Sequence, residues 1–183
     1  MDDEQIIRCL KSGEMDKIEL LVTRYQIKAL RVAFLITQDE HLAEDVVQET
    51  FIRIVHGIRR FDESRPFEPY LMRSVVNASL NVARREKRLL SLDSNASTVD
   101  NLLARAALVD SQAEYARIEQ DILSALSQLP PRERVVIIQR YYLEMSEKEM
   151  ADALNSAPGT IKWLLNLARS HLRTLLRSER SAE

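Results

Sequence analysis

A shortage of chain-breaking residues constrains this sequence more than any other feature. Only three glycines and five prolines occur in 183 residues, while Leu, Ala, Glu, Arg and Gln are abundant. These side chains lose little rotamer freedom in a helix, and the backbone entropy cost of glycine is nearly absent. We find no alternating β-branched runs between glycine-rich turns, the pattern that indicates hairpins. The sequence therefore predicts an all-α fold.

Hydrophobic periodicity divides the chain into helical segments. They are predicted at residues 3–12, 15–37, 40–59, 68–88, 113–127, 131–143, 147–154 and 157–178. Residues 89–112 are rich in Ser, Asn and Asp, which is typical of a linker, with one helical turn predicted at 102–108. We therefore expect two small helical domains, 1–88 and 113–183, each with a modest core.

The cysteine count and the start of the chain indicate a compartment. Cys9 is the only cysteine, so no intrachain disulfide can form and a reducing environment fits. The acidic opening "MDDEQIIRCLKSGEMD" lacks the basic and apolar regions of a signal peptide. No stretch approaches the ~18 uninterrupted apolar residues of a spanning helix. We expect a cytoplasmic protein with no membrane insertion.

Charge is unevenly distributed, although the formal net charge is only −2. Residues 1–50 contain eleven acids and six Lys or Arg, whereas residues 53–88 contain nine Lys or Arg and four acids. Residues 161–180 add five basic groups against one acid. The net charge alone argues weakly against a nucleic-acid partner, but local fields steer ligands. Two basic patches separated by acidic surface are therefore expected.

The segment 43–54, "AEDVVQETFIRI", is predicted to be an amphipathic helix with an unusual polar side. At ~100° per residue one face is apolar, comprising Ala43, Val47, Phe51, Ile54 and Ile58. The opposite face comprises Asp45, Gln48, Glu49 and Ile52. A solvated face is the simpler interpretation, but Ile52 has no apolar neighbour there. A mixed patch of this kind suits a protein partner with a basic rim and an apolar centre.

The segment 59–69, "RRFDESRPFEP", and the helix after it carry a second polar surface. Four- and three-residue steps place Arg73, Asn77, Asn81, Arg84 and Arg88 on one stripe, and another is lined by Leu71, Val75, Ala78 and Val82. Cations that meet phosphates, amides that reach base edges and nearby rings are what single-stranded DNA requires. Phe61, Phe67 and Tyr70 are alternatively core residues, an interpretation that we favour for Phe67, as for Leu71.

The segment 145–176 predicts a helix-turn-helix. Ser146 and Glu149 form a capping box, and Pro158 suits the first turn of the second helix. The buried stripe of that helix is predicted to be Ile161, Leu165, Ala168, Leu172 and Leu175. Gly159, Trp163, Asn166, Ser170 and Arg173 are predicted to face outward, where such a helix enters the major groove of DNA.

Catalytic and metal-binding patterns are missing from the sequence. His41, His56 and His171 are far apart and lack ligand spacing with each other or with Cys9. No glycine-rich phosphate loop occurs. We therefore predict no enzyme, no catalytic residues, no metal and no cofactor.

Three long segments resemble bacterial RNA polymerase sigma factors of the extracytoplasmic-function (ECF) type. They are "ALRVAFLITQDEHLAEDVVQETFIRIVHGIRRFD", "FEPYLMRSVVNASLNVARREKR" and "ALSQLPPRERVVIIQRYYLEMSEKEMADALNSAPGTIKWLLNLARSHLRTLL". The resemblance implies that the protein binds core RNA polymerase through the clamp helices of the largest subunit. It further implies promoter DNA as a partner, single-stranded at the −10 element and duplex at −35. An anti-sigma factor and a linker that threads toward the RNA path are also implied.

The resemblance assigns site residues by position. The implied polymerase contacts are Asp45, Gln48, Glu49 and Ile52. The implied −10 residues are Arg60, Phe61, Asp62, Arg65, Asn77, Asn81 and Arg84. The implied −35 residues are Lys162, Trp163, Asn166, Arg169 and Arg173. The chain departs from the family where "GTIKWLL" places Trp163 and Leu164 in positions usually held by serine and arginine. Tyr70 and Asn81 stand where the family often has tryptophan and aspartate.

Two alternatives remain open from the sequence. A plain helix-turn-helix regulator would account for residues 147–178 only, leaving the acidic helix and the basic stripe unexplained. A sigma-like adaptor or decoy would use its helix-turn-helix for a protein contact, and the altered "WLL" segment is its best support.

Overall fold

The computed structural model describes residues 1–90 and 113–181, and the regular structure in these two ranges is entirely helical. The all-α prediction is confirmed, with helical domains on both sides of residues 91–112. The helical turn predicted at 102–108 and the side chain of Arg88 lie outside the described residues.

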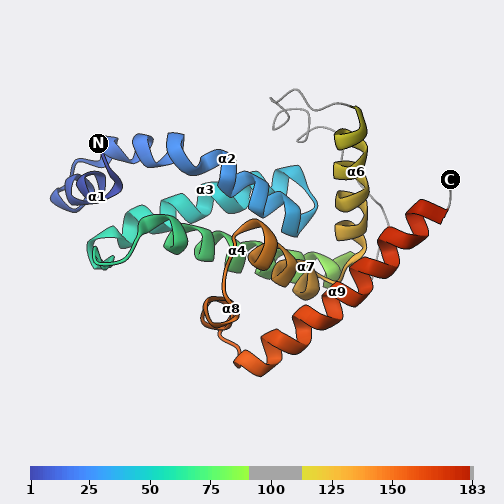
Figure 1. Cartoon of the computed structure of the whole chain (residues 1–183). Coiled ribbons are helices and arrows are strands. Elements are labelled where there is room, and N and C mark those ends of the chain that lie inside the picture. The colour runs from blue at the N-terminus through green and yellow to red at the C-terminus, as the bar shows by residue number, and fades with distance from the viewer. Residues whose placement is uncertain (91–112, 182–183) are drawn as a thin grey trace.

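The N-terminal domain is a bundle of three long helices with a short helix across one end (Figure 1). Its elements are α1 (Asp3–Ser12), η1 (Met15–Lys17), α2 (Ile18–Thr37), α3 (Glu40–Gly57), η2 (Ile58–Arg60) and α4 (Phe67–Leu90). Helix α1 begins with a capping box between Asp2 and Gln5. It ends at Gly13, whose φ of 106° lies in the left-handed region that favours glycine.

The C-terminal domain carries the predicted helix-turn-helix. Its elements are α6 (Ala113–Gln128), α7 (Pro131–Ile137), the π-helix η3 (Ile138–Tyr142), α8 (Glu147–Leu154) and α9 (Pro158–Ser181). The capping box of Ser146 and Glu149 and the helix start at Pro158 are confirmed. The single helix predicted over 131–143 was wrong in one respect, because its last turn widens into η3.

The predicted buried stripes are largely confirmed. The α3 stripe from Ala43 to Ile58 is buried throughout, and Phe67 and Leu71 of α4 are core residues. On α9, Ile161, Leu165 and Ala168 are buried, whereas the predicted stripe becomes half-buried toward the end of the helix, at Leu172 and Leu175. Burial of one face fixes the rotation of each helix about its axis, and thereby decides which side chains reach solvent.

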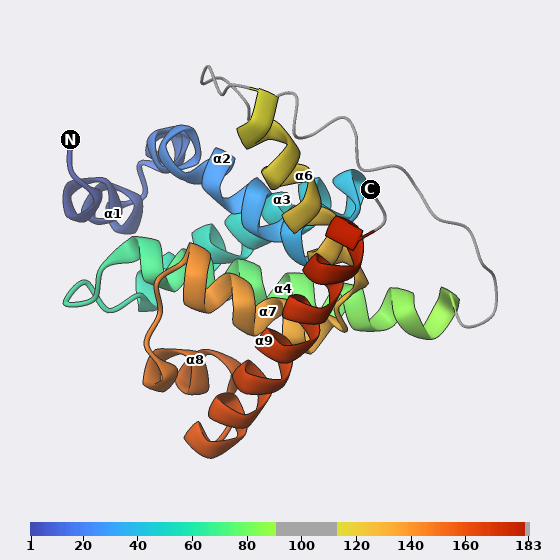
Figure 2. The same ribbon diagram turned by 45° about the vertical axis from the view of Figure 1, so that its right-hand side comes forward.

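The two domains pack against each other, with α7 in contact with both α2 and α4 (Figures 1 and 2). Arg134 of α7 is only 7% exposed, and its guanidinium donates hydrogen bonds to four backbone carbonyls. The acceptors are Ile36 near the end of α2, Leu126 and Ser127 in the last turn of α6, and Leu129 just after that helix. Burial lowers the pKa of Arg134 to about 10. A cation that meets several helix-terminal carbonyls offsets their missing partners, so Arg134 joins the domains.

Candidate functional site

One face of α3 is exposed to solvent and carries acidic, amide and aliphatic side chains. Asp39 caps the start of α3 by accepting a hydrogen bond from the backbone N–H of Leu42 at 2.9 Å. Because the opposite face is buried, the exposed side chains have a fixed orientation. This surface, the acidic face, consists of Asp45, Gln48, Glu49 and Ile52, all exposed as the helical wheel predicts.

Two side chains of the acidic face are suited to contact with a partner. The side chain of Ile52 is 49% exposed although it is large and apolar. Glu49 forms an ion pair with Arg53 one turn later, with 2.8 Å between Oε1 and Nη2. An exposed pair of this spacing contributes only ~0.3–0.5 kcal/mol. Glu49 can therefore exchange Arg53 for a basic group on a partner at little cost.

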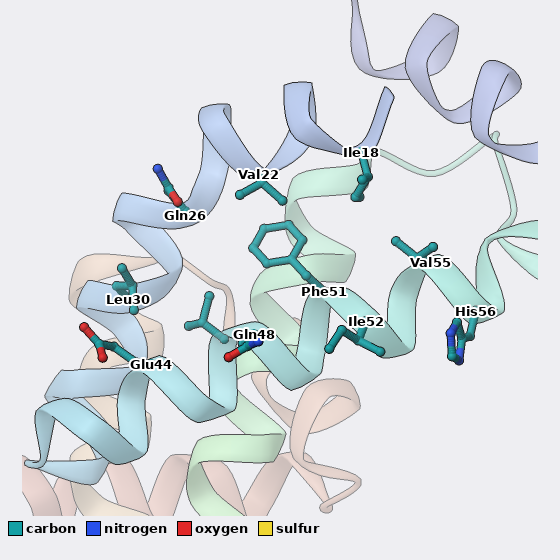
Figure 3. Close-up of a pocket in the computed structure, with 11 residues that line it drawn as sticks. Ile18, Val22, Gln26, Leu30, Glu44, Gln48, Phe51, Ile52, Val55 and His56 are labelled. Carbon is teal, nitrogen blue, oxygen red and sulfur yellow. The ribbon is translucent and has the colours of Figure 1, made fainter. Parts of the chain in front are cut away.

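A groove of about 610 Å³ lies between α2 and α3, beside the acidic face (Figure 3). Its walls are mainly apolar, comprising Ile18, Val22, Leu30, Val47, Phe51, Ile52 and Val55. Gln48 and Ile52 belong both to this groove and to the acidic face. The sequence analysis missed Glu44 and His56, which also line the groove. A continuous surface therefore offers carboxylates beside an apolar slot.

The 61–66 loop between η2 and α4 is held in a turn by hydrogen bonds and an ion pair between its own residues. The carboxylate of Asp62 accepts hydrogen bonds from the backbone N–H and the hydroxyl of Ser64, at 3.1 and 2.7 Å. It also pairs with Arg65, with 3.3 Å between Oδ2 and Nε. These hydrogen bonds from Ser64, followed by the charge of Arg65, lower the pKa of Asp62. Arg60 and Arg65 are exposed on either side of this turn.

An aromatic cluster anchors the same loop to the bundle. The ring of Phe61 lies 4.9 Å from that of Tyr70 and 5.9 Å from that of Phe67, measured between centroids. Phe61 is 8% exposed and Phe67 1%, whereas Tyr70 is 39% exposed. The Phe61 ring therefore packs in the core and, in this conformation, is not available for stacking on a base. Tyr70 is the ring of this cluster that reaches solvent.

The polar stripe of α4 runs along the side of the helix that faces the C-terminal domain. The α4 stripe consists of Arg73, Asn77, Asn81 and Arg84, and Asn77 is half-buried while the others are exposed. Arg73 donates a hydrogen bond to the backbone carbonyl of Asp152 in α8. A cavity of about 330 Å³ is lined by the whole stripe on one side and, on the other, by residues such as Asn155, Thr160 and Leu164. The structure thus brings the stripe together with the start of α9.

The outward face of α9 matches the prediction. Gly159, Lys162, Trp163, Asn166 and Arg173 are all exposed, and Trp163 has 63% of its surface in solvent. Leu164, which stands where the resemblance expects arginine, is half-buried and turned toward the cavity against α4. The exposed positions therefore present two cations, an amide and one large aromatic side chain.

Arg169 of α9 is held by an aromatic side chain from the π-helix η3. Its Nε donates a hydrogen bond to the hydroxyl of Tyr141 at 2.9 Å, and the guanidinium carbon lies 5.8 Å from the centre of the Tyr141 ring. Tyr141 is itself 60% exposed. π-helical turns are frequent at functional sites. Here the turn presents a ring that orients a cation on the neighbouring helix.

Within the described ranges, no three His, Cys, Asp or Glu side chains are placed so that they could hold a metal ion together. In the same residues, no helix is both long enough and apolar enough to cross a bilayer.

Comparison with known proteins identifies the family. The family Sigma-70 region 2 matches residues 21–89, and the family Sigma-70, region 4 matches residues 119–172. The ECF RNA polymerase sigma factor SigW of Bacillus subtilis is 29% identical over 177 residues, which span 93% of this chain and 95% of that protein. The chain belongs to the ECF-type RNA polymerase sigma factors. SigM of the same organism is 28% identical over 158 residues, 86% of this chain and 94% of its own.

Two solved structures share the fold of this sigma factor. The structure of CnrH in complex with the cytosolic domain of CnrY has a TM-score of 0.63 and 25% identity, and covers 96% of this chain and 97% of its own. The sigma factor RpoE from Bartonella quintana, in complex with the anti-sigma factor NepR, has a TM-score of 0.66 and 24% identity. That match covers 90% of this chain and 97% of RpoE.

Membership of the sigma factor family establishes the general function of this protein. Sigma factors direct RNA polymerase to specific promoters and are not enzymes. The acidic face, the 61–66 loop and the α4 stripe lie inside the region 2 match, while Trp163 and Arg169 lie inside the region 4 match. Both regions are present and in order, whereas a plain helix-turn-helix regulator would explain only the second of them. The sigma factor interpretation therefore accounts for more of the chain.

Proposed function

We propose that the acidic face and the adjoining groove bind the clamp helices of the largest subunit of RNA polymerase. Carboxylates at Asp45 and Glu49 would meet basic side chains, while Ile52 and the apolar groove would receive aliphatic ones. Charge at a rim gives orientation and fast association, and apolar burial at a centre gives affinity. The exposure of Ile52 and the fixed rotation of α3 support this assignment.

The −10 element is assigned to the 61–66 loop and the α4 stripe. The cations Arg60, Arg65 and Arg84 would neutralise phosphates of the non-template strand, and Asn77 and Asn81 would contact base edges. The turn that Asp62 closes would capture one flipped base and so start melting. Phe61 would contribute indirectly, by anchoring this loop to the core, which agrees with its 8% exposure.

The −35 element is assigned to the outward face of α9. Lys162, Arg169 and Arg173 would contact phosphates or guanine edges, and Asn166 would reach a base edge in the major groove. Trp163 would add an apolar contact, of the kind that reads a thymine methyl group. Its exposure of 63% supports an intermolecular partner for this ring rather than packing within its own domain.

An anti-sigma factor is proposed as the regulator. The two similar proteins of known structure are in complex with CnrY and NepR, the second named as an anti-sigma factor. Here such a protein would cover the acidic face and compete with polymerase. A polymerase partner would require the protein to be in the bacterial cytoplasm, the location that we propose. We propose boundaries for the two domains at 1–88 and 113–183, with 89–112 as the linker through the enzyme.

The observation that carries the proposal is the acidic face, whose orientation is fixed by the core and whose four side chains are exposed. Gel filtration with purified core RNA polymerase tests it, and co-elution at a one-to-one ratio is expected without a regulator. Promoters selected from random DNA by the reconstituted holoenzyme should then support run-off transcription. Separate elution, or transcription equal to that of core enzyme alone, would refute the assignment.

A further inference from the structure

Helix α1 touches the 61–66 loop through one lysine. Ile6, Ile7 and Leu10 of α1 are buried in the bundle, which fixes the helix beside η2. Lys11, in the last turn of α1, points its ammonium group at the loop. Figures 1 and 2 both show α1 and the turn between α3 and α4 at the same end of the molecule.

The ammonium group of Lys11 makes two short contacts across fifty residues of sequence. Its Nζ donates a hydrogen bond to the backbone carbonyl of Phe61 at 2.7 Å and to the carboxylate of Glu63 at 2.6 Å. The side chain of Lys11 is 23% exposed and that of Glu63 is 38% exposed. A cation shared between a carbonyl and a carboxylate forms charge-assisted bonds, which are stronger than neutral ones. The start of the loop is thus held from outside.

The contacts of Lys11 bracket the turn that Asp62 forms. Phe61 precedes Asp62 and Glu63 follows it, so both neighbours of Asp62 are fixed by the same ammonium group. Asp62 in turn holds Ser64 and Arg65. The loop therefore has its shape before any DNA is bound. A loop that is already ordered avoids the entropy loss of ordering it at the moment of binding.

We propose that Lys11 is a positioning residue for promoter melting, which fixes the 61–66 loop in the shape that captures a flipped base. The inference rests on the −10 function proposed above. Unstacking and unpairing a base is unfavourable, so a loop that also had to be ordered would slow opening. Lys11 does not touch the base. It acts through the Phe61 carbonyl and Glu63, and only after polymerase has brought the loop to the promoter.

The test uses holoenzymes reconstituted with core polymerase and a promoter selected by the wild-type protein. 2-Aminopurine placed at each −10 position of the non-template strand reports the captured base, and its fluorescence rise gives the rate of opening. In Lys11→Met this rate should fall about tenfold, as expected for loss of two charge-assisted bonds. Closed-complex affinity at low temperature should stay within about twofold. Lys11→Arg, which retains donors and charge, should recover most of the rate.

A matched control separates positioning from simple stabilisation. Lys17 pairs with Asp16 in η1 and is 34% exposed, so Lys17→Met makes the same chemical change without removing a contact to the loop. It should open promoters at the wild-type rate. An abasic site at the captured position gives the decisive readout. Wild type should slow there to the rate of Lys11→Met, whereas Lys11→Met itself should slow no further.

Each outcome decides one proposal. If the wild-type holoenzyme shows no captured base at any −10 position, the proposed −10 function fails. If it captures a base and Lys11→Met opens equally fast, the Lys11 inference alone is overturned. If the abasic site slows Lys11→Met by the same factor as wild type, the inference is overturned as well, because Lys11 then acts independently of the captured base.

Discussion

The acidic face of α3 and the polar stripe of α4 are neighbours in one bundle, but they are presented in opposite ways. The four residues of the acidic face are all open to solvent, and the groove beside them is open too. The α4 stripe instead faces the C-terminal domain, with Arg73 bonded to the Asp152 carbonyl and Asn77 half-buried above a shared cavity.

This difference implies an order of events. The surface assigned to polymerase is ready in the isolated protein. The α4 stripe keeps Arg73, Asn81 and Arg84 exposed, but it lines a cavity shared with the C-terminal domain and becomes fully accessible only when the domains separate. Arg134 on Ile36 and the guanidinium of Arg31, 5.7 Å from the Tyr142 ring centre, hold the domains together. Polymerase binding would therefore come first, and full exposure of the α4 stripe would follow from it.

The largest effect is expected on the acidic face. Asp45→Lys with Glu49→Lys reverses two charges that polymerase would meet, and close charge pairs at interfaces are worth ~2–5 kcal/mol each when broken. The dissociation constant for core polymerase should rise at least about a hundredfold, measured by fluorescence anisotropy. Circular dichroism should be unchanged, because both side chains are exposed. Glu14→Lys with Asp16→Lys makes the same charge change in the α1–α2 connection and should bind normally.

A smaller and later effect is expected on the α4 stripe. Asn77→Ala with Arg84→Ala removes an amide and a cation assigned to the opened strand, without altering the acidic face. Permanganate-detected melting should fall between about tenfold and a hundredfold. Polymerase affinity and closed-complex formation should change by less than about threefold. Arg85→Ala, an adjacent exposed arginine, is the control. Equal losses in closed and open complexes would indicate general phosphate binding instead.

The order of events can be tested by accessibility. In a Cys9→Ser background, the thiol of Gln48→Cys should react quickly in the free protein and about tenfold more slowly in the holoenzyme. The thiol of Asn77→Cys should change in the opposite direction, because the cavity that shields it opens. Thiol-labelling rates followed by mass spectrometry measure both. Parallel changes at the two positions would contradict the comparison.

The sequence was a good guide to these surfaces where one helix decides them. Periodicity is a property of a single helix, so the acidic face, the α4 stripe and the outward side of α9 could all be predicted. The groove beside α3 could not, because a second helix, α2, supplies one of its walls through Ile18, Val22 and Leu30. For the same reason, the sequence could not show that the C-terminal domain partly covers the α4 stripe.

Contacts to backbone carbonyls were beyond reach for a different reason. Arg132 is exposed and Arg134 is buried, yet no pattern in "PPRER" distinguishes them. Arg134 is distinguished by its hydrogen bonds to four backbone carbonyls at helix ends. Every residue type has a backbone carbonyl, so these acceptors leave no signal in the sequence. Lys11 similarly meets the carbonyl of Phe61 through the fold alone. The sequence also could not show whether Phe61 is a core residue or a ring that stacks on a base.

The smallest effect concerns the covering domain. Ser146→Ala removes the hydroxyl that caps α8, the helix whose Asp152 carbonyl receives Arg73, and should lower the free energy of unfolding by about 1 kcal/mol. Hydrogen bonds from Ser146 lower the pKa of Glu149. Their contribution to stability is therefore present above the ordinary pKa of glutamate and is lost as pH falls through the lowered value. Urea denaturation at pH 7 and pH 3 should show the difference between the two proteins shrinking in acid.

Polymerase affinity should not change in Ser146→Ala, whereas the labelling rate at Asn77→Cys should rise by no more than about fivefold. A change in polymerase affinity would show that the covering domain also controls the acidic face, and that the two surfaces are not independent.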